Sequence, residues 1–187
     1  GVIGQMMEKV VLPEQRTRLT DEEVIARCPW ATTGRTHHRT PNIITSLELD
    51  PAEMEKRNIH LQKKYAEIEE NEVRFEELHC EDAEYLIVAF GSCARIAQKA
   101  MEMAREEGIK VGLLRPITLW PFPSKAIAAR AAQVKGILTV ELNAGQMVED
   151  VRLAVECKVP VEHFGRLGGI VPDPDEVITA LKEKLIK

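Results

Sequence analysis

The chain has 187 residues and a formal net charge of -5, and 44% of its residues are hydrophobic while 29% are charged. These proportions are typical of a globular protein and exclude collagen-like, repeat and intrinsically disordered classes. A chain of this length buries enough surface to fold without a disulfide or structural metal. No apolar stretch approaches the roughly 20 residues that span a bilayer, and no signal peptide is recognisable. We therefore expect a soluble, cytoplasmic protein without membrane contact.

Charge and cysteine spacing exclude two further classes. With 25 basic against 30 acidic residues and no aromatic-studded basic stripe, the sequence does not resemble a nucleic-acid binder. The four cysteines occupy positions 28, 80, 93 and 157, without the close pairs that zinc or iron–sulfur sites need. The adjacent side chains of His37 and His38 diverge on most backbones, so no metal site is predicted.

The first part of the chain has no clear periodicity. Residues 1–50 contain the turn-prone positions Pro29, Gly34 and Pro41, and we expect them to form a long connection over a surface. Because the sequence begins with Gly1, we expect it to belong to a longer chain. A basic cluster in this region, which is either a solvated loop or an anion-binding site, consists of Arg35, His37, His38 and Arg39.

A helix is predicted from residue 51 to residue 71. Asp50, Pro51 and Glu53 supply a capping residue, a proline at the first helical position and an acid three residues after the cap. Its apolar residues form one narrow stripe, which is typical of a connecting helix on a surface. They are Met54, Leu61, Tyr65 and Ile68. Residues 72–79 alternate imperfectly and are a candidate edge strand.

From Glu84 onward, short apolar runs alternate with helical patterns, which predicts βα units around a parallel sheet. Strands are predicted over residues 85–90, 111–114, 137–140 and 161–164. Ser92 is the expected N-cap of the first helix and Gly108 its C-cap. A second helix is expected around residues 125–134. The last helix begins with a strong start pattern, Asp173-Pro174-Asp175-Glu176.

Ligands of open α/β sheets collect at the carboxyl ends of the strands, so this edge is where we place a ligand site or an interface. Its candidate residues are Ser92, Arg115, Glu141, Asn143, Gln146, Gly165 and Arg166. No complete catalytic set is present among them. The first turn has one glycine, Gly91, where a dinucleotide fingerprint needs three, and Ser92 lacks the G-x-S-x-G context of a nucleophile.

Several of these residues have two interpretations. Asn143 and Gln146 either hold an anionic ligand or form a capping box at a helix start, and their spacing favours the capping box. Glu141 closes an apolar strand and needs a cation, either Arg115, Arg166 or one from a partner chain. Cys93 lies at a helix start, which lowers a thiol pKa, but most free cysteines are buried and inert. The glycines at 165, 168 and 169 serve turn geometry or a close approach to a ligand.

Three stretches carry a resemblance to a known family: Tyr85-Leu-Ile-Val-Ala-Phe-Gly-Ser92, Leu114-Arg-Pro-Ile-Thr-Leu-Trp-Pro-Phe-Pro123 and Thr139-Val-Glu-Leu-Asn-Ala-Gly-Gln146. They resemble the transketolase C-terminal-like domain of alpha-type subunits of 2-oxoacid:ferredoxin oxidoreductases, especially the 2-oxoisovalerate and 2-oxoglutarate types. The pieces Gly4-Gln-Met-Met-Glu8 and Pro41-Asn-Ile-Ile-Thr45 resemble the end of the preceding pyrimidine-binding domain and the interdomain connection.

The resemblance implies a fold and a division of the chain. The fold is a three-layer α/β/α domain whose mostly parallel five-stranded sheet has an antiparallel first strand, supplied by residues 72–79. Residues 1–50 would be the end of the preceding domain and the connection, 51–71 a linker helix, and 72–187 the transketolase C-terminal-like domain.

The resemblance also implies an activity that belongs to a complex. Such complexes oxidatively decarboxylate a 2-oxo acid, transfer the acyl group to coenzyme A and reduce ferredoxin. Thiamine diphosphate sits between the pyrimidine-binding domain and a beta-type subunit, and gamma-type and ferredoxin-like chains complete the assembly with iron–sulfur clusters. No cofactor-binding residue of the family has a counterpart here, so we expect an assembly role and no activity from the isolated chain. The alternatives are a free-standing Rossmann-like nucleotide enzyme and a flavodoxin-like interaction module.

Overall fold

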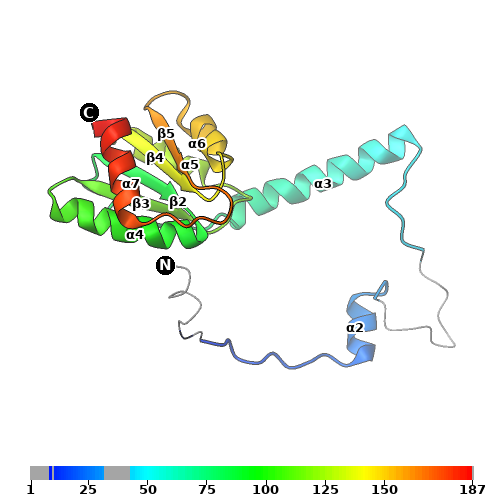
Figure 1. Cartoon of the computed structure of the whole chain (residues 1–187). Helices are drawn as coiled ribbons and strands as arrows, with labels where there is room; N and C mark the ends of the chain where they lie inside the picture. The colour runs from blue at the N-terminus through cyan, green and yellow to red at the C-terminus, as the bar shows by residue number, and fades with distance from the viewer. Residues whose placement is uncertain (1–8, 10, 32–42, 187) are drawn as a thin grey trace. The chain divides into compact units, whose positions relative to one another are not determined.

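The structure, a computed structural model, describes residues 9, 11–31 and 43–186 (Figure 1). The described residues divide into two units, Lys9–Gln62 and the residues from Lys63 onward. The basic cluster predicted between Arg35 and Arg39 lies outside the described residues.

The first unit contains a short helix that the periodicity did not predict. Helix α2 spans Asp21–Arg27, and a capping box closes its start. The Thr20 side chain accepts the Glu23 N–H at 3.3 Å, and Glu23 accepts the Thr20 N–H at 2.9 Å. The spacing of threonine and glutamate is a known start pattern, so the signal was present in the sequence.

Helix α3 spans Pro51–Asn71, as predicted. Asp50 caps it, because its Oδ1 accepts the N–H groups of Ala52 at 2.9 Å and Glu53 at 3.0 Å. None of its residues is buried, which agrees with the narrow apolar stripe in its sequence. No described helix is long and apolar enough to cross a membrane.

The second unit is built on a five-stranded sheet in the order β1-β3-β2-β4-β5. Its strands are β1 (Phe75–Leu78), β2 (Tyr85–Ala89), β3 (Val111–Pro116), β4 (Gly136–Glu141) and β5 (Val161–Gly165). β1 pairs antiparallel with β3, and the remaining pairs are parallel. The predicted edge strand and the mostly parallel sheet are therefore both confirmed.

Two helices cover each face of this sheet (Figure 1). One core packs α4 (Gly91–Glu106) and α7 (Pro174–Leu181) against the strands. The other core packs α5 (Ser124–Ala131) and α6 (Met147–Val155) against the opposite face. A π-helical turn, η1 (Lys182–Ile186), follows α7. The layers are those of the predicted α/β/α architecture.

The helix ends test the predicted caps. Ser92 is not the N-cap of α4. The helix begins at Gly91, two residues earlier than that cap implies, and Phe90 takes the cap position without a side-chain hydrogen bond. Gly108 does end α4: its φ is 85°, its N–H donates to Arg105 O at 2.9 Å, and Ile109 N–H donates to Ala104 O at 3.0 Å.

The other two helix predictions have different outcomes. α5 ends at Ala131 and not at residue 134, since Gln133 N–H bonds back to Arg130 O at 2.9 Å and tightens the last turn. The start of α7 is confirmed, with Asp173 and Glu176 forming both hydrogen bonds of a capping box at 2.9 and 3.2 Å.

Candidate functional site at the carboxyl edge of the sheet

The connections that follow β2, β3, β4 and β5 meet at the carboxyl edge, and all seven predicted site residues lie there. The structure brings only part of this set together. Glu141, Asn143, Gln146 and Gly165 form one hydrogen-bonded and close-packed cluster, and the backbone of Arg166 joins it. Ser92 lies in the first turn of α4, and the Arg115 side chain pairs with Glu76.

Glu141 is the centre of the cluster, and its side chain is fully buried. Its Oε2 accepts the N–H groups of Gln146 at 3.2 Å and Met147 at 2.9 Å, and its Oε1 accepts the Val148 N–H at 3.0 Å. These are the amides that a helix start leaves without an intrahelical partner. A carboxylate from the end of β4 therefore satisfies the start of α6 and meets the positive end of its dipole.

This arrangement corrects two predictions. Arg115 instead pairs with Glu76 at 2.8 Å, and Arg166 pairs with Glu176 at 3.1 Å, so neither guanidinium is the partner of Glu141. The backbone N–H groups at the start of α6, and not a cationic side chain, balance the charge of the buried Glu141 carboxylate.

The capping box expected from Asn143 and Gln146 is also absent. Gln146 is the N-cap of α6 and makes no side-chain capping bond. Asn143 instead donates from Nδ2 to Glu141 Oε2 at 3.1 Å and accepts the Gly145 N–H at Oδ1 at 2.7 Å. Its role is to hold the turn that carries the chain from β4 into α6. The Gln146 N–H, which the predicted capping box would give to Asn143, is accepted by Glu141 instead.

His163, on β5, extends the cluster and was not predicted. Its Nδ1 lies 3.4 Å from Glu141 Oε1 and 3.2 Å from Thr139 Oγ1, and its Nε2 lies 3.3 Å from Asn143 O. Thr139 is fully buried, and its hydroxyl donates to Glu162 O at 3.3 Å. No local sequence pattern identifies His163. Its place beside Thr139 results from the parallel pairing of β4 with β5, two strands that are distant in the sequence.

Gly165 is required by a close approach. A Cβ added at this position would lie 2.1 Å from Asn143 O and 2.6 Å from His163 Nε2. The space beside β5 is thus filled by the β4–α6 turn, and the flexible, ligand-approaching loop considered for Gly165 is not what the structure shows there.

Two thiols of this unit, those of Cys80 and Cys93, are buried. Burial raises the pKa of the Cys93 thiol to about 11, and the nearby negative charge of Glu141 adds to this rise. Cys80 has a pKa raised to about 11 for the same primary reason. The interpretation of Cys93 as an inert buried cysteine is therefore favoured over an activated thiol. Among the described residues, no group of three or more His, Cys, Asp or Glu is placed to hold a metal ion.

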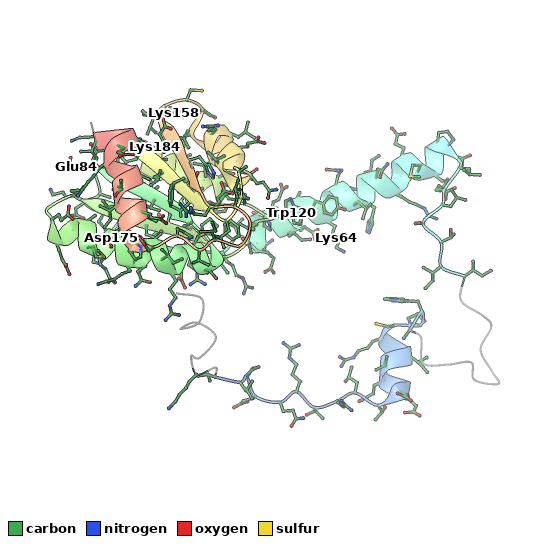
Figure 2. All side chains as sticks on the ribbon, in the orientation of Figure 1. Lys64, Glu84, Trp120, Lys158, Asp175 and Lys184 are labelled. Atoms are coloured by element: carbon green, nitrogen blue, oxygen red, sulfur yellow. The ribbon has the colours of Figure 1, made fainter. Side chains whose placement is uncertain are left out.

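Exposed apolar side chains crowd this edge, which the sequence did not predict. Ile117, Leu119 and Trp120 after β3 are 48%, 48% and 55% exposed, and Leu142 after β4 is 45% exposed. Further members follow β5, namely Leu167, Ile170 and Val171. Figure 2 shows Trp120 on the side of the α/β unit toward which β4 and β5 run.

A cavity of about 160 Å³ opens between these loops. Phe90, Leu119, Phe122 and Met147 supply its apolar lining, and Glu141, Gln146 and Asp150 supply its polar lining. A larger cavity of about 490 Å³ lies away from the cluster, between β1 and α4. Its charged side chains include two acids and three cations, among them Arg115 with its partner Glu76.

The mostly parallel five-stranded sheet with helices on both faces defines a class of protein, the α/β/α domains of the transketolase C-terminal-like fold. Residues 83–177, half of the chain, match the family described as pyruvate:ferredoxin oxidoreductase core domain II. The chain belongs to this family. The resemblance to subunits of 2-oxoacid:ferredoxin oxidoreductases is thereby confirmed.

Curated relatives narrow the position within the family. Ketoisovalerate oxidoreductase subunit VorB of Methanothermobacter thermautotrophicus is 43% identical over 183 residues, which are 98% of this chain and 50% of that protein. 2-Oxoglutarate synthase subunit KorA of Archaeoglobus fulgidus is 30% identical over 175 residues, which are 92% of this chain and 48% of that protein. The chain thus spans about half the length of the curated relatives it matches.

A solved structure supports the fold. The 2-oxoglutarate:ferredoxin oxidoreductase from Magnetococcus marinus, with 2-oxoglutarate, coenzyme A and succinyl-CoA bound, superposes with a TM-score of 0.63 at 25% sequence identity. The match covers 73% of this chain and 24% of that chain.

Proposed function

We propose that this chain acts as the core domain II of a subunit in a thiamine diphosphate-dependent 2-oxo acid:ferredoxin oxidoreductase. The assembled enzyme would oxidatively decarboxylate a 2-oxo acid, form the acyl-CoA and reduce ferredoxin. The observation that carries the proposal is the 43% identity to VorB along 98% of the chain. The domain division at residues 50 and 71 belongs to the same proposal.

The substrate we favour is a branched-chain 2-oxo acid of the 2-oxoisovalerate type. Identity to the ketoisovalerate subunit is 43% over nearly the whole chain, whereas identity to the Archaeoglobus fulgidus 2-oxoglutarate subunit is 30% over 92% of it. The difference supports the branched-chain acid over 2-oxoglutarate.

The described residues do not fit the cofactors of such an enzyme. Cys80 and Cys93 are buried, and no cysteines gather into the set that an iron–sulfur cluster needs within residues 11–31 and 43–186. The buried carboxylate at the edge, Glu141, is already committed to three backbone amides and Asn143. We therefore place thiamine diphosphate and the clusters on other parts of the complex, and assign this domain a role in assembly.

Reconstitution tests the proposal. We expect the purified chain to give no 2-oxo acid-dependent reduction of ferredoxin or a viologen dye. We expect turnover when it is co-expressed with the remaining half of the subunit, which its relatives contain, and with the companion subunits encoded in the same genome. In that complex, 2-oxoisovalerate should give a higher kcat/KM than 2-oxoglutarate or pyruvate.

Two results would contradict the proposal in different ways. Turnover by the isolated chain would remove the assembly role. A complex that prefers 2-oxoglutarate would leave the oxidoreductase assignment intact but correct the substrate.

A further inference from the structure

The apolar part of the carboxyl edge has the character of a protein-binding surface. We define the edge platform as Phe90, Ile117, Leu119, Trp120, Phe122 and Leu142. Four of these side chains are between 45% and 55% exposed. Isolated exposed apolar residues are ordinary, but a group of large ones in adjoining loops marks an interaction site.

The platform is held in place before any partner arrives. Thr118 accepts the Arg74 N–H at 3.0 Å and donates to Pro121 O at 2.8 Å, which fixes the loop on both sides of Leu119. The Tyr65 ring meets the Trp120 ring edge-on with centroids 5.6 Å apart. On the other side, Glu141 and Asn143 fix the turn that carries Leu142. Such preorganisation lowers the entropy cost of binding.

The cavity in the platform is the size of a side chain. Its volume of about 160 Å³ is well below the roughly 300 Å³ at which small-molecule pockets begin. A pocket of this size at the centre of an apolar surface is where an anchoring side chain of a protein partner inserts.

Charge decides which side chain fits. Asp150 lines the cavity, and Glu149 lies beside it in the first turn of α6. Neither carboxylate has an ion-pair partner among the described residues. The edge arginines do not neutralise them, because Arg115 is paired with Glu76 and Arg166 with Glu176. The mouth of the pocket is therefore negative while its walls, Phe90 and Phe122, are aromatic.

We propose that the edge platform docks a companion subunit whose contact surface is apolar and carries an arginine or lysine that enters the pocket beside Asp150. Aromatic walls favour a cation through the ring quadrupole, and the long apolar stem of such a side chain matches the pocket lining. This inference rests on the proposed function, which supplies the companion subunit.

The test measures association of the full chain with the companion subunits of the reconstituted complex. We expect Leu119→Ser and Asp150→Lys each to weaken association by about tenfold or more. Raising NaCl from about 50 to about 500 mM should weaken the wild-type association, and Asp150→Asn should reduce this salt dependence. Circular dichroism confirms that each variant is folded.

The matched controls are two exposed residues that do not belong to the edge platform. Leu153 is 76% exposed on α6, the helix that carries Asp150, and Glu70 is an exposed acid on α3. Leu153→Ser and Glu70→Lys should change association by less than about twofold.

The outcomes separate the two proposals. If the wild-type complex assembles and turns over while the edge variants associate like wild type, the docking inference is overturned and the proposed function stands. If Leu119→Ser weakens association but Asp150→Lys and salt do not, the basic partner is wrong and the inference is equally overturned. A wild-type chain that neither assembles nor supports turnover overturns both.

Discussion

Glu141 shows how a single carboxylate can replace a helix cap from a neighbouring element. Its two oxygens accept three backbone amides of α6 and the Asn143 side chain, all in a site closed to solvent. Such charge-assisted bonds are stronger than neutral ones. The cluster therefore fixes the β4–α6 turn more firmly than the predicted asparagine cap would.

We expect Glu141→Gln to lower the free energy of unfolding by about 2 kcal/mol. The side-chain NH₂ of glutamine cannot accept the hydrogen bonds that backbone N–H groups now donate to one of the carboxylate oxygens. Urea unfolding followed by circular dichroism measures this change. Glu69→Gln on the exposed surface of α3 is the control and should be nearly neutral. Equal effects of the two substitutions would show that Glu141 has no special part in the edge.

We also expect Glu141→Ala to weaken subunit association more than Glu69→Ala.

Gly165 carries a second residue-level prediction. Because an added Cβ would lie 2.1 Å from Asn143 O, Gly165→Ala should displace the β4–α6 turn and lower the free energy of unfolding by about 2 kcal/mol. Gly168→Ala is the matched control: its φ is 63° but nothing lies within 4 Å of the added atom, so its cost should be about 1 kcal/mol. A Gly165→Ala variant as stable as its control would contradict the packing described here.

The buried thiols predict a pH dependence. Burial raises the pKa of Cys80 and of Cys93 to about 11 from the ordinary value of 9.0. The unfolded chain therefore releases these protons first, and the free energy of unfolding should fall as pH rises from 9 to 11. At pH 8, a disulfide reagent should modify the exposed Cys157 in the folded chain, and Cys80 and Cys93 only after urea is added. Rapid labelling of Cys93 in the folded chain would contradict its buried state.

At the scale of the element, β1 is a short edge strand that is tied to a helix by one ion pair. Arg130 of α5 donates from Nε and an Nη atom to both oxygens of Glu77, at 2.9 and 2.6 Å. The two side chains are only 21% and 23% exposed. The hydrogen bond from Arg130 lowers the pKa of Glu77 below its ordinary value.

Removing this pair should loosen β1. We expect Glu77→Gln to lower the free energy of unfolding by about 2 kcal/mol at pH 7. The lowered Glu77 pKa also means that the stabilisation is complete above pH 4.5 and is lost as pH falls below that value. Glu76→Gln, which removes the more exposed pair with Arg115, should cost less than about 0.5 kcal/mol. Chemical denaturation at pH 7 and pH 3 measures both effects, and a Glu77→Gln variant that loses as much stability at pH 3 as at pH 7 would refute the assignment.

The helix starts show which elements the sequence encodes locally. Asp173 and Glu176 cap α7 within four residues, so their spacing alone predicted the start. The start of α6 is capped by Glu141, which lies on the preceding strand. No short spacing pattern describes that contact. Asn143, which is nearer to the helix in the sequence, was wrongly predicted to be its cap. α2 has a local capping box at Thr20 and was missed because its apolar periodicity is weak.

The candidate site divides in the same way. The positions of Glu141, Asn143 and Gln146 at the carboxyl edge followed from the βα pattern, since parallel strands end together. The part played by His163 depends on the pairing of β4 with β5. The exposure of Leu119 and Trp120 depends on which loops remain uncovered after folding. The contacts of His163 and the exposure of these two side chains both depend on tertiary structure, which the periodicity of the sequence cannot predict.

At the scale of the whole molecule, the stabilising core is confined to one part of the described chain. Every buried residue that the structure describes lies between Cys80 and Leu181. In the described part of residues 9–62, by contrast, apolar side chains such as Val11, Ile43 and Ile44 are at least 72% exposed. Apolar burial is the main favourable term in folding, so these segments add little of it to the chain.

We therefore expect the chain from Lys63 to Lys187 to fold without the residues before it. Its thermal midpoint should lie within about 3 °C of that of the full chain, because none of the described residues before Lys63 is buried. Trypsin should cleave the full chain first at the exposed Arg16 and Arg18 and leave the α/β unit intact, because local backbone opening there breaks no core contact. The Glu141→Gln variant is the internal control, since its loss of stability should be equal in the long and short chains. A short chain that unfolds at a much lower temperature would contradict this expectation.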